Sequence, residues 1–194
     1  MTRGERLRCV VIVCCYFLRN LAYYRVGWKH RDNWRELTVN PNASFWRAVS
    51  ANFIDFCVLD WCKLFGDDKN KRHKDYGEHY WGKIVSDPQK FESELLQRLK
   101  ITTVEFESFR REMREYRDKF LAHLDSDREM RIPKLDLAKG SVEFYCEYVM
   151  QNEAQTGVLT GLPDTTEKLQ RGYPEWQDEA ERVYRQLGAK SDGR

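Results

Sequence analysis

The stretch of sequence that decides the fold covers residues 103–124 and reads TVEFESFRREMREYRDKFLAHL. Its apolar residues recur at the spacing typical of the buried face of an α-helix, and they are Val104, Phe106, Phe109, Met113, Tyr116, Phe120 and Leu124. Thr102 or Thr103 provides an N-cap, and the acidic Glu105 and Glu107 suit the positive end of a helix. The pattern therefore predicts a helix that runs to about Leu124.

The rest of the chain repeats this helical spacing, and the alternation typical of strands is scarce. Helices are predicted over residues 5–26, 43–65, 80–85 (a short turn), 88–100, 136–152 and 174–187. Gly27 is expected to break the first of these helices, and Pro174 to open the last. The chain is thus predicted to be all-α, an up-and-down bundle of four or five main helices. Residues 1–155 would form the bundle, and residues 156–194 a loop and a C-terminal helix that packs on it or extends it.

The composition and the net charge of the chain limit the functions that it can have. A chain of 194 residues is long enough to bury a sizeable core, and its net charge of +2 means that anions must bind at local clusters. Most of the six cysteines fall in apolar helical patterns, as free thiols do. No secretory signal is convincing, and the apolar run from Cys9 to Leu18 is too short to span a bilayer. We therefore expect a cytoplasmic protein with reduced cysteines and no membrane contact.

The candidate catalytic residues lie in residues 117–123, RDKFLAH. Arg117 can hold a phosphate through two parallel hydrogen bonds, and His123 can move a proton near neutral pH. Arg110, Arg114 and Arg117 recur at i, i+4 and i+7, on one stripe of the helix. No acidic residue stands three or four positions from Arg117, so its partner is expected outside this helix.

His123 does not face the same way as Arg117 on a straight α-helix, because the residues between them rotate it by roughly 240°. Either the helix loosens near Leu124 and Asp125, or a second copy of the chain presents its own pair. The second route predicts a symmetric dimer with the site at its axis. Purely structural uses of these residues stay open, since a histidine suits the negative end of a helix and an arginine stripe suits a solvated face.

Residues 117–123 resemble the signature of the HEPN superfamily, in which an arginine, often followed by a polar residue, precedes a histidine. Together with residues 61–66 (WCKLFG), 79–81 (HYW) and 116–125, they resemble the abortive-infection protein U-like HEPN family over about residues 40–155. The resemblance implies a dimeric helical bundle that acts in many members as a metal-independent endoribonuclease. It matches Arg117 and His123 to the catalytic pair and Asp118 to the polar position after the arginine.

The implied reaction needs neither a metal nor a cofactor. The ribose 2′-hydroxyl would attack the neighbouring phosphorus while His123 transfers a proton and Arg117 stabilises the charged oxygens. Arg114 and Arg110 are the candidates for contacts with the RNA backbone. Members of the family often serve in toxin–antitoxin or anti-phage systems, so the expected partners are RNA, a second copy and an antitoxin or regulator. The alternative function is a non-catalytic helical dimer that binds RNA, a nucleotide or a regulatory protein.

Four further patterns have purely structural interpretations that we favour. Cys57, Cys62, His73 and His79 would make a zinc site of poor spacing, so the cysteines are expected in the core. The basic run at residues 69–74 is expected to be solvated, although it could touch RNA. Trp81 is expected to be a packing anchor, although it could stack on a base with its neighbours. The segment 10–18 is expected to be a buried helix, although it could meet a membrane or a partner.

Overall fold

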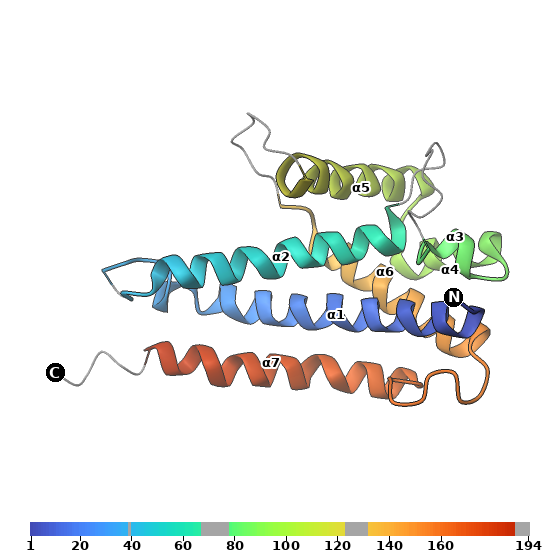
Figure 1. Ribbon diagram of the computed structural model, residues 1–194. Helices are drawn as coiled ribbons and strands as arrows, with labels where there is room; N and C mark the ends of the chain where they lie inside the picture. The colour runs from blue at the N-terminus through green and yellow to red at the C-terminus, as the bar shows by residue number, and fades with distance from the viewer. Residues whose placement is uncertain (39, 67–77, 123–131, 189–194) are drawn as a thin grey trace.

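The computed structural model describes residues 1–38, 40–66, 78–122 and 132–188, and every regular element in this part of the chain is helical (Figure 1). Its seven α-helices are α1 (Arg3–Lys29), α2 (Ala43–Phe65), α3 (Trp81–Ile84), α4 (Pro88–Leu99), α5 (Thr103–Tyr116), α6 (Leu135–Tyr148) and α7 (Thr166–Gly188). A 3₁₀ turn, η1 (Arg31–Asn33), follows α1, and the π-helical turns η2 (Arg117–Ala122) and η3 (Val149–Glu153) continue α5 and α6. The prediction of an all-α fold is confirmed.

Helix α1 is the central element of the fold. It packs against α2, α6 and α7, and Figure 1 shows it lying between α2 and α7. Val10 and Val11, which point about 100° apart around the helix, are both fully buried, as is Phe17. Within the described residues, α1 is the one helix long and apolar enough to cross a membrane, and 50% of its apolar window is buried inside the protein. The apolar segment 10–18 therefore serves the core, as the sequence predicts.

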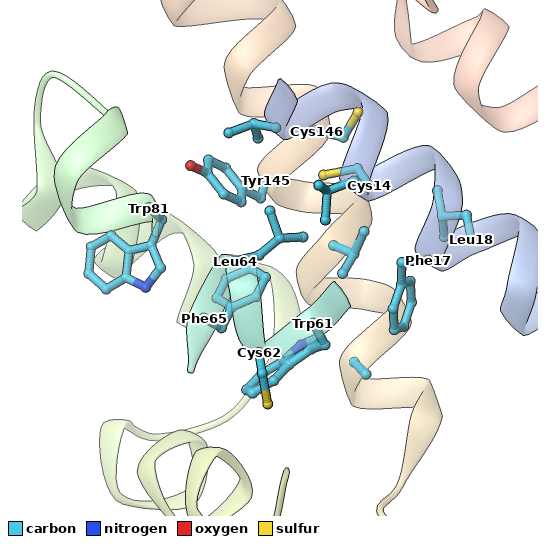
Figure 2. Close-up of a cluster of buried hydrophobic side chains, with 14 of the residues drawn as sticks. Cys14, Phe17, Leu18, Trp61, Cys62, Leu64, Phe65, Trp81, Tyr145 and Cys146 are labelled. Atoms are coloured by element: carbon cyan, nitrogen blue, oxygen red, sulfur yellow. The ribbon is translucent and has the colours of Figure 1, made fainter. Parts of the chain in front are cut away.

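Trp61 of α2 belongs to the cluster of buried side chains beside α1 (Figure 2). Its indole is fully buried, and its ring centroid lies 5.0 Å from that of Phe109 on α5 and 5.2 Å from that of Phe65. The indole Nε1–H donates to the hydroxyl of Ser141 on α6 over 2.8 Å. One side chain thus joins α2, α5 and α6, and its only polar group is satisfied.

Trp81 of α3 extends the same aromatic core. Its ring stacks on Phe91 of α4 with the centroids 5.0 Å apart, and the side chain is 7% exposed. The prediction that Trp81 is a packing anchor is confirmed. A ring buried in this way is not presented to a nucleic-acid base.

The predicted start of the last helix is wrong. Helix α7 begins at Thr166, and Pro174 lies inside it. The side chain of Thr165 accepts a hydrogen bond from the backbone N–H of Lys168 over 3.3 Å, so this cap starts the helix eight residues earlier than predicted. Proline inside a helix removes one backbone hydrogen bond. The burial of Leu169 and the packing of Tyr173 against the core offset that loss.

The predicted break at Gly27 is also wrong, because α1 continues to Lys29. A Cβ atom at position 27 would lie 2.6 Å from the hydroxyl oxygen of Tyr184 on α7. The glycine therefore serves the close approach of α1 and α7. It does not end the helix.

Candidate functional site

Arg117 is the residue at which the α-helical geometry of α5 changes to the π-helical geometry of η2. Its Nε and Nη2 atoms both lie 2.7 Å from Oδ1 of Asp118. The Arg117 side chain is 24% exposed and that of Asp118 is 55% exposed, so solvent reaches the pair. The expectation of a partner outside this helix is wrong, because the neighbouring residue pairs with Arg117. Short π-helical turns are rare and occur frequently at functional sites.

Arg114 lies about one helical turn before Arg117 and Asp118, and the charges of all three act on Cys62 of α2. Burial raises the pKa of the Cys62 thiol to about 11, while the positive charges of Arg117 and Arg114 act in the opposite direction and Asp118 adds to the rise. All three charged groups therefore lie within electrostatic reach of one sulfur atom. The structure brings together three of the five candidate site residues beside α2.

Arg110 departs from this arrangement. It is 7% exposed, and its Nε–H donates to the backbone carbonyl of Phe65 over 2.9 Å. It also forms an ion pair with Glu107. The predicted solvated stripe is therefore wrong at Arg110, because this guanidinium caps the C-terminal end of α2. We leave Arg110 out of the proposed RNA contacts.

His123, the predicted proton-transfer residue, lies outside the described residues, as does the basic run at residues 69–74. The two cysteines of the weighed zinc site point to different helices. The Cys57 thiol lies 3.7 Å from the carbonyl oxygen of Phe17 on α1, and the Cys62 thiol lies 3.7 Å from that of Met113 on α5. Within the described part of the chain, no group of three or more potential ligands converges on a metal position.

Asp55 of α2 stabilises the junction between α5 and η2, a role that the sequence pattern did not predict. The hydroxyl of Tyr116, the last residue of α5, donates to Oδ1 of Asp55 over 2.9 Å. Burial raises the pKa of Tyr116 and also that of Asp55. The ring of Tyr116 lies 5.5 Å from that of Phe120 in η2. The one available signal was an acidic residue between the apolar Ile54 and Phe56.

The substitution Tyr116→Phe should loosen this junction. Removal of the hydroxyl leaves the partly buried Asp55 carboxylate without its donor, which costs about 1–3 kcal/mol of unfolding free energy. Urea denaturation measures this loss, and hydrogen exchange should show faster opening of the amides of residues 117–120. Asp55→Asn, which keeps a carbonyl acceptor, is the matched control and should lose less. Unchanged stability and exchange in Tyr116→Phe would contradict the assigned role.

Comparison of the chain with protein-family models, with curated proteins and with solved structures gave no match. The functional assignment therefore depends on the chemistry of the residues around Arg117 and on the sequence resemblance.

Proposed function

We propose that this protein is a metal-independent endoribonuclease of HEPN type. The observation that carries the proposal is the position of Arg117, which lies at an α-to-π junction, is paired with Asp118 and is still in contact with solvent. The all-helical fold and the proximity of Arg114 support it. The sequence resemblance supplies the reaction type.

In the proposed reaction the 2′-hydroxyl of a ribose loses its proton and attacks the adjacent phosphorus atom. The bond from phosphorus to the 5′-oxygen of the next nucleotide breaks, and protonation of that oxygen leaves a 5′-hydroxyl and a 2′,3′-cyclic phosphate. Asp118 orients the Arg117 guanidinium through Nε and Nη2, and the Nη1 hydrogens remain directed to the non-bridging oxygens of the phosphate. Negative charge builds on these oxygens in the transition state, so a fixed guanidinium lowers the barrier. Arg114 contacts a neighbouring backbone phosphate.

His123 is the proposed proton-transfer residue, and a second copy of the chain completes the site. On one straight helix Arg117 and His123 do not face the same way. Two chains related by a two-fold axis would each present an arginine and a histidine, so the arginine of one chain meets the histidine of the other. Exposed apolar side chains on α2, Phe45 at 61% and Phe56 at 53%, support the presence of an association surface. We place the protein in the cytoplasm as a toxin or anti-phage effector under the control of an antitoxin or regulator.

The direct test is incubation of the purified protein with mixed RNA in excess chelator. Wild-type protein should cleave RNA under these conditions, and His123→Ala should cleave about 10² to 10⁴ times more slowly with an unchanged circular dichroism spectrum. Equal cleavage by wild type and variant would remove the role of His123. RNA binding without cleavage by the wild type would instead favour the alternative function, a non-catalytic binding module.

A further inference from the structure

A second basic surface shares no residue with the candidate site. A hollow of about 230 Å³ opens where the start of α1 meets α3, and the described residues that line it are Met1, Arg3, Arg6, Leu7, Lys83 and Ile84. We call it the N-terminal basic pocket. Three of its side chains are cationic, although one of them, Arg3, is paired with Glu153, and none of the residues that line the pocket is acidic. In a molecule with a net charge of only +2, this concentration of positive charge is local.

The helix end adds to the positive field of this pocket. Arg3 is the first residue of α1 and Arg6 lies one turn further along, where the backbone N–H groups give a helix its positive end. Arginines are unfavourable at this end unless an anion compensates them. The acidic residue of this turn, Glu5, is engaged in the cap with Thr2. Within the described part of the chain, Arg6 is exposed and forms no ion pair.

Arg3 is fixed in place by a network that joins three parts of the chain. Its Nη2 lies 3.0 Å from the hydroxyl of Ser86 and forms an ion pair with Glu153, and its Nη1 donates to the carbonyl of Ile84 over 3.2 Å. The Glu153 side chain is 2% exposed and also accepts the backbone N–H of Ser86 over 2.7 Å. The guanidinium on one wall of the pocket is therefore pre-positioned, which reduces the entropy lost when a ligand binds.

We propose that the N-terminal basic pocket binds a phosphoryl group. Guanidinium and ammonium groups are the donors that phosphate prefers. The apolar side chains of Leu7 and Ile84 complete the lining of the pocket. The phosphoryl group can belong to the RNA backbone or to a free nucleotide, because both present the same oxygens. This site does not depend on the nuclease proposal, since binding can be measured without cleavage.

Isothermal titration calorimetry with inorganic pyrophosphate at constant ionic strength tests the pocket. Wild-type protein should bind one equivalent saturably, and Arg6→Gln and Lys83→Gln should each raise the Kd about tenfold, the cost of one lost charge-assisted contact. The matched control, Arg47→Gln, changes an exposed arginine on α2 and should leave the Kd unchanged. Thermal melts of the variants establish that they fold.

A competition arm identifies the source of the phosphoryl group. Displacement of pyrophosphate by a 5′-hydroxyl RNA oligonucleotide assigns the pocket to the RNA backbone, and displacement by ADP alone assigns it to a nucleotide. Absence of saturable binding, or an Arg6→Gln variant that binds as tightly as the wild type, would overturn the proposal. Because His123 and Arg117 are unchanged in these variants, loss of pyrophosphate binding is distinguishable from failure of the nuclease proposal.

Discussion

Replacement of Arg117 by alanine should lower the rate of RNA cleavage in chelator by about 10² to 10³, the usual cost of removing one preorganised donor to a developing oxyanion. The side chain is partly exposed, and its partner Asp118 is more exposed still, so the fold should survive the change. Arg117→Lys keeps the charge but loses the planar pair of donors, and should recover only part of the rate. Initial rates on a labelled RNA measure the effect.

The matched control for Arg117 lies on the same helix. Arg111 of α5 is an exposed arginine that lies about 240° around the helix from Arg117, and Arg111→Ala should cleave RNA at the wild-type rate. If both alanine variants lost activity equally, the loss would reflect a general reduction of positive charge. Full activity in Arg117→Ala would remove Arg117 from the mechanism.

The substitution Trp61→Ala should lower the free energy of unfolding by about 3–5 kcal/mol, the range for truncating a large buried aromatic side chain. The indole packs against Phe65 and Phe109 and donates to Ser141, so its loss leaves a cavity among three helices. The Ser141 hydroxyl keeps its bond to the Ala138 carbonyl and is not left without a partner. The cost therefore comes mainly from the cavity.

Urea denaturation followed by circular dichroism measures the effect of Trp61→Ala. Trp28, which is 47% exposed at the end of α1, provides the control, and Trp28→Ala should change the stability by about 0.5 kcal/mol or less. A loss of under about 1 kcal/mol in Trp61→Ala would contradict the central position of this indole in the core.

Most of the helices could be predicted because apolar spacing, caps and breakers agree along the sequence. Asp87 and Pro88, for example, start α4 as expected, with the Asp87 side chain accepting the backbone N–H of Lys90 over 3.0 Å. Gly27 and Pro174 misled the prediction because their local preferences oppose a helix. Tertiary packing against Tyr184 and around Leu169 decides the outcome at these positions, and a single sequence does not show that packing.

The candidate site was predictable in its chemistry but not in its geometry. The sequence places Arg114, Arg117 and Asp118 in one helix, but spacing rules for α-helices do not foresee a π-helical turn or the pairing of adjacent residues. Burial of Arg110 follows from the end of α2, which is remote in sequence. The hydrogen bond between Asp55 and Tyr116 also joins residues that are remote in sequence, so the spacing within one helix does not predict it.

The most direct test of the central claim is the Nε–Hε resonance of Arg117 in a titration with uncleavable 2′-O-methyl RNA. We predict that this resonance shifts saturably, because a phosphate bound at the Nη1 hydrogens changes the electronic environment of the guanidinium whose Nε–H stays paired with Asp118. The resonance of Arg111 should stay in place. RNA binding that leaves Arg117 unshifted would show that the phosphodiester is held elsewhere and would contradict the proposed site.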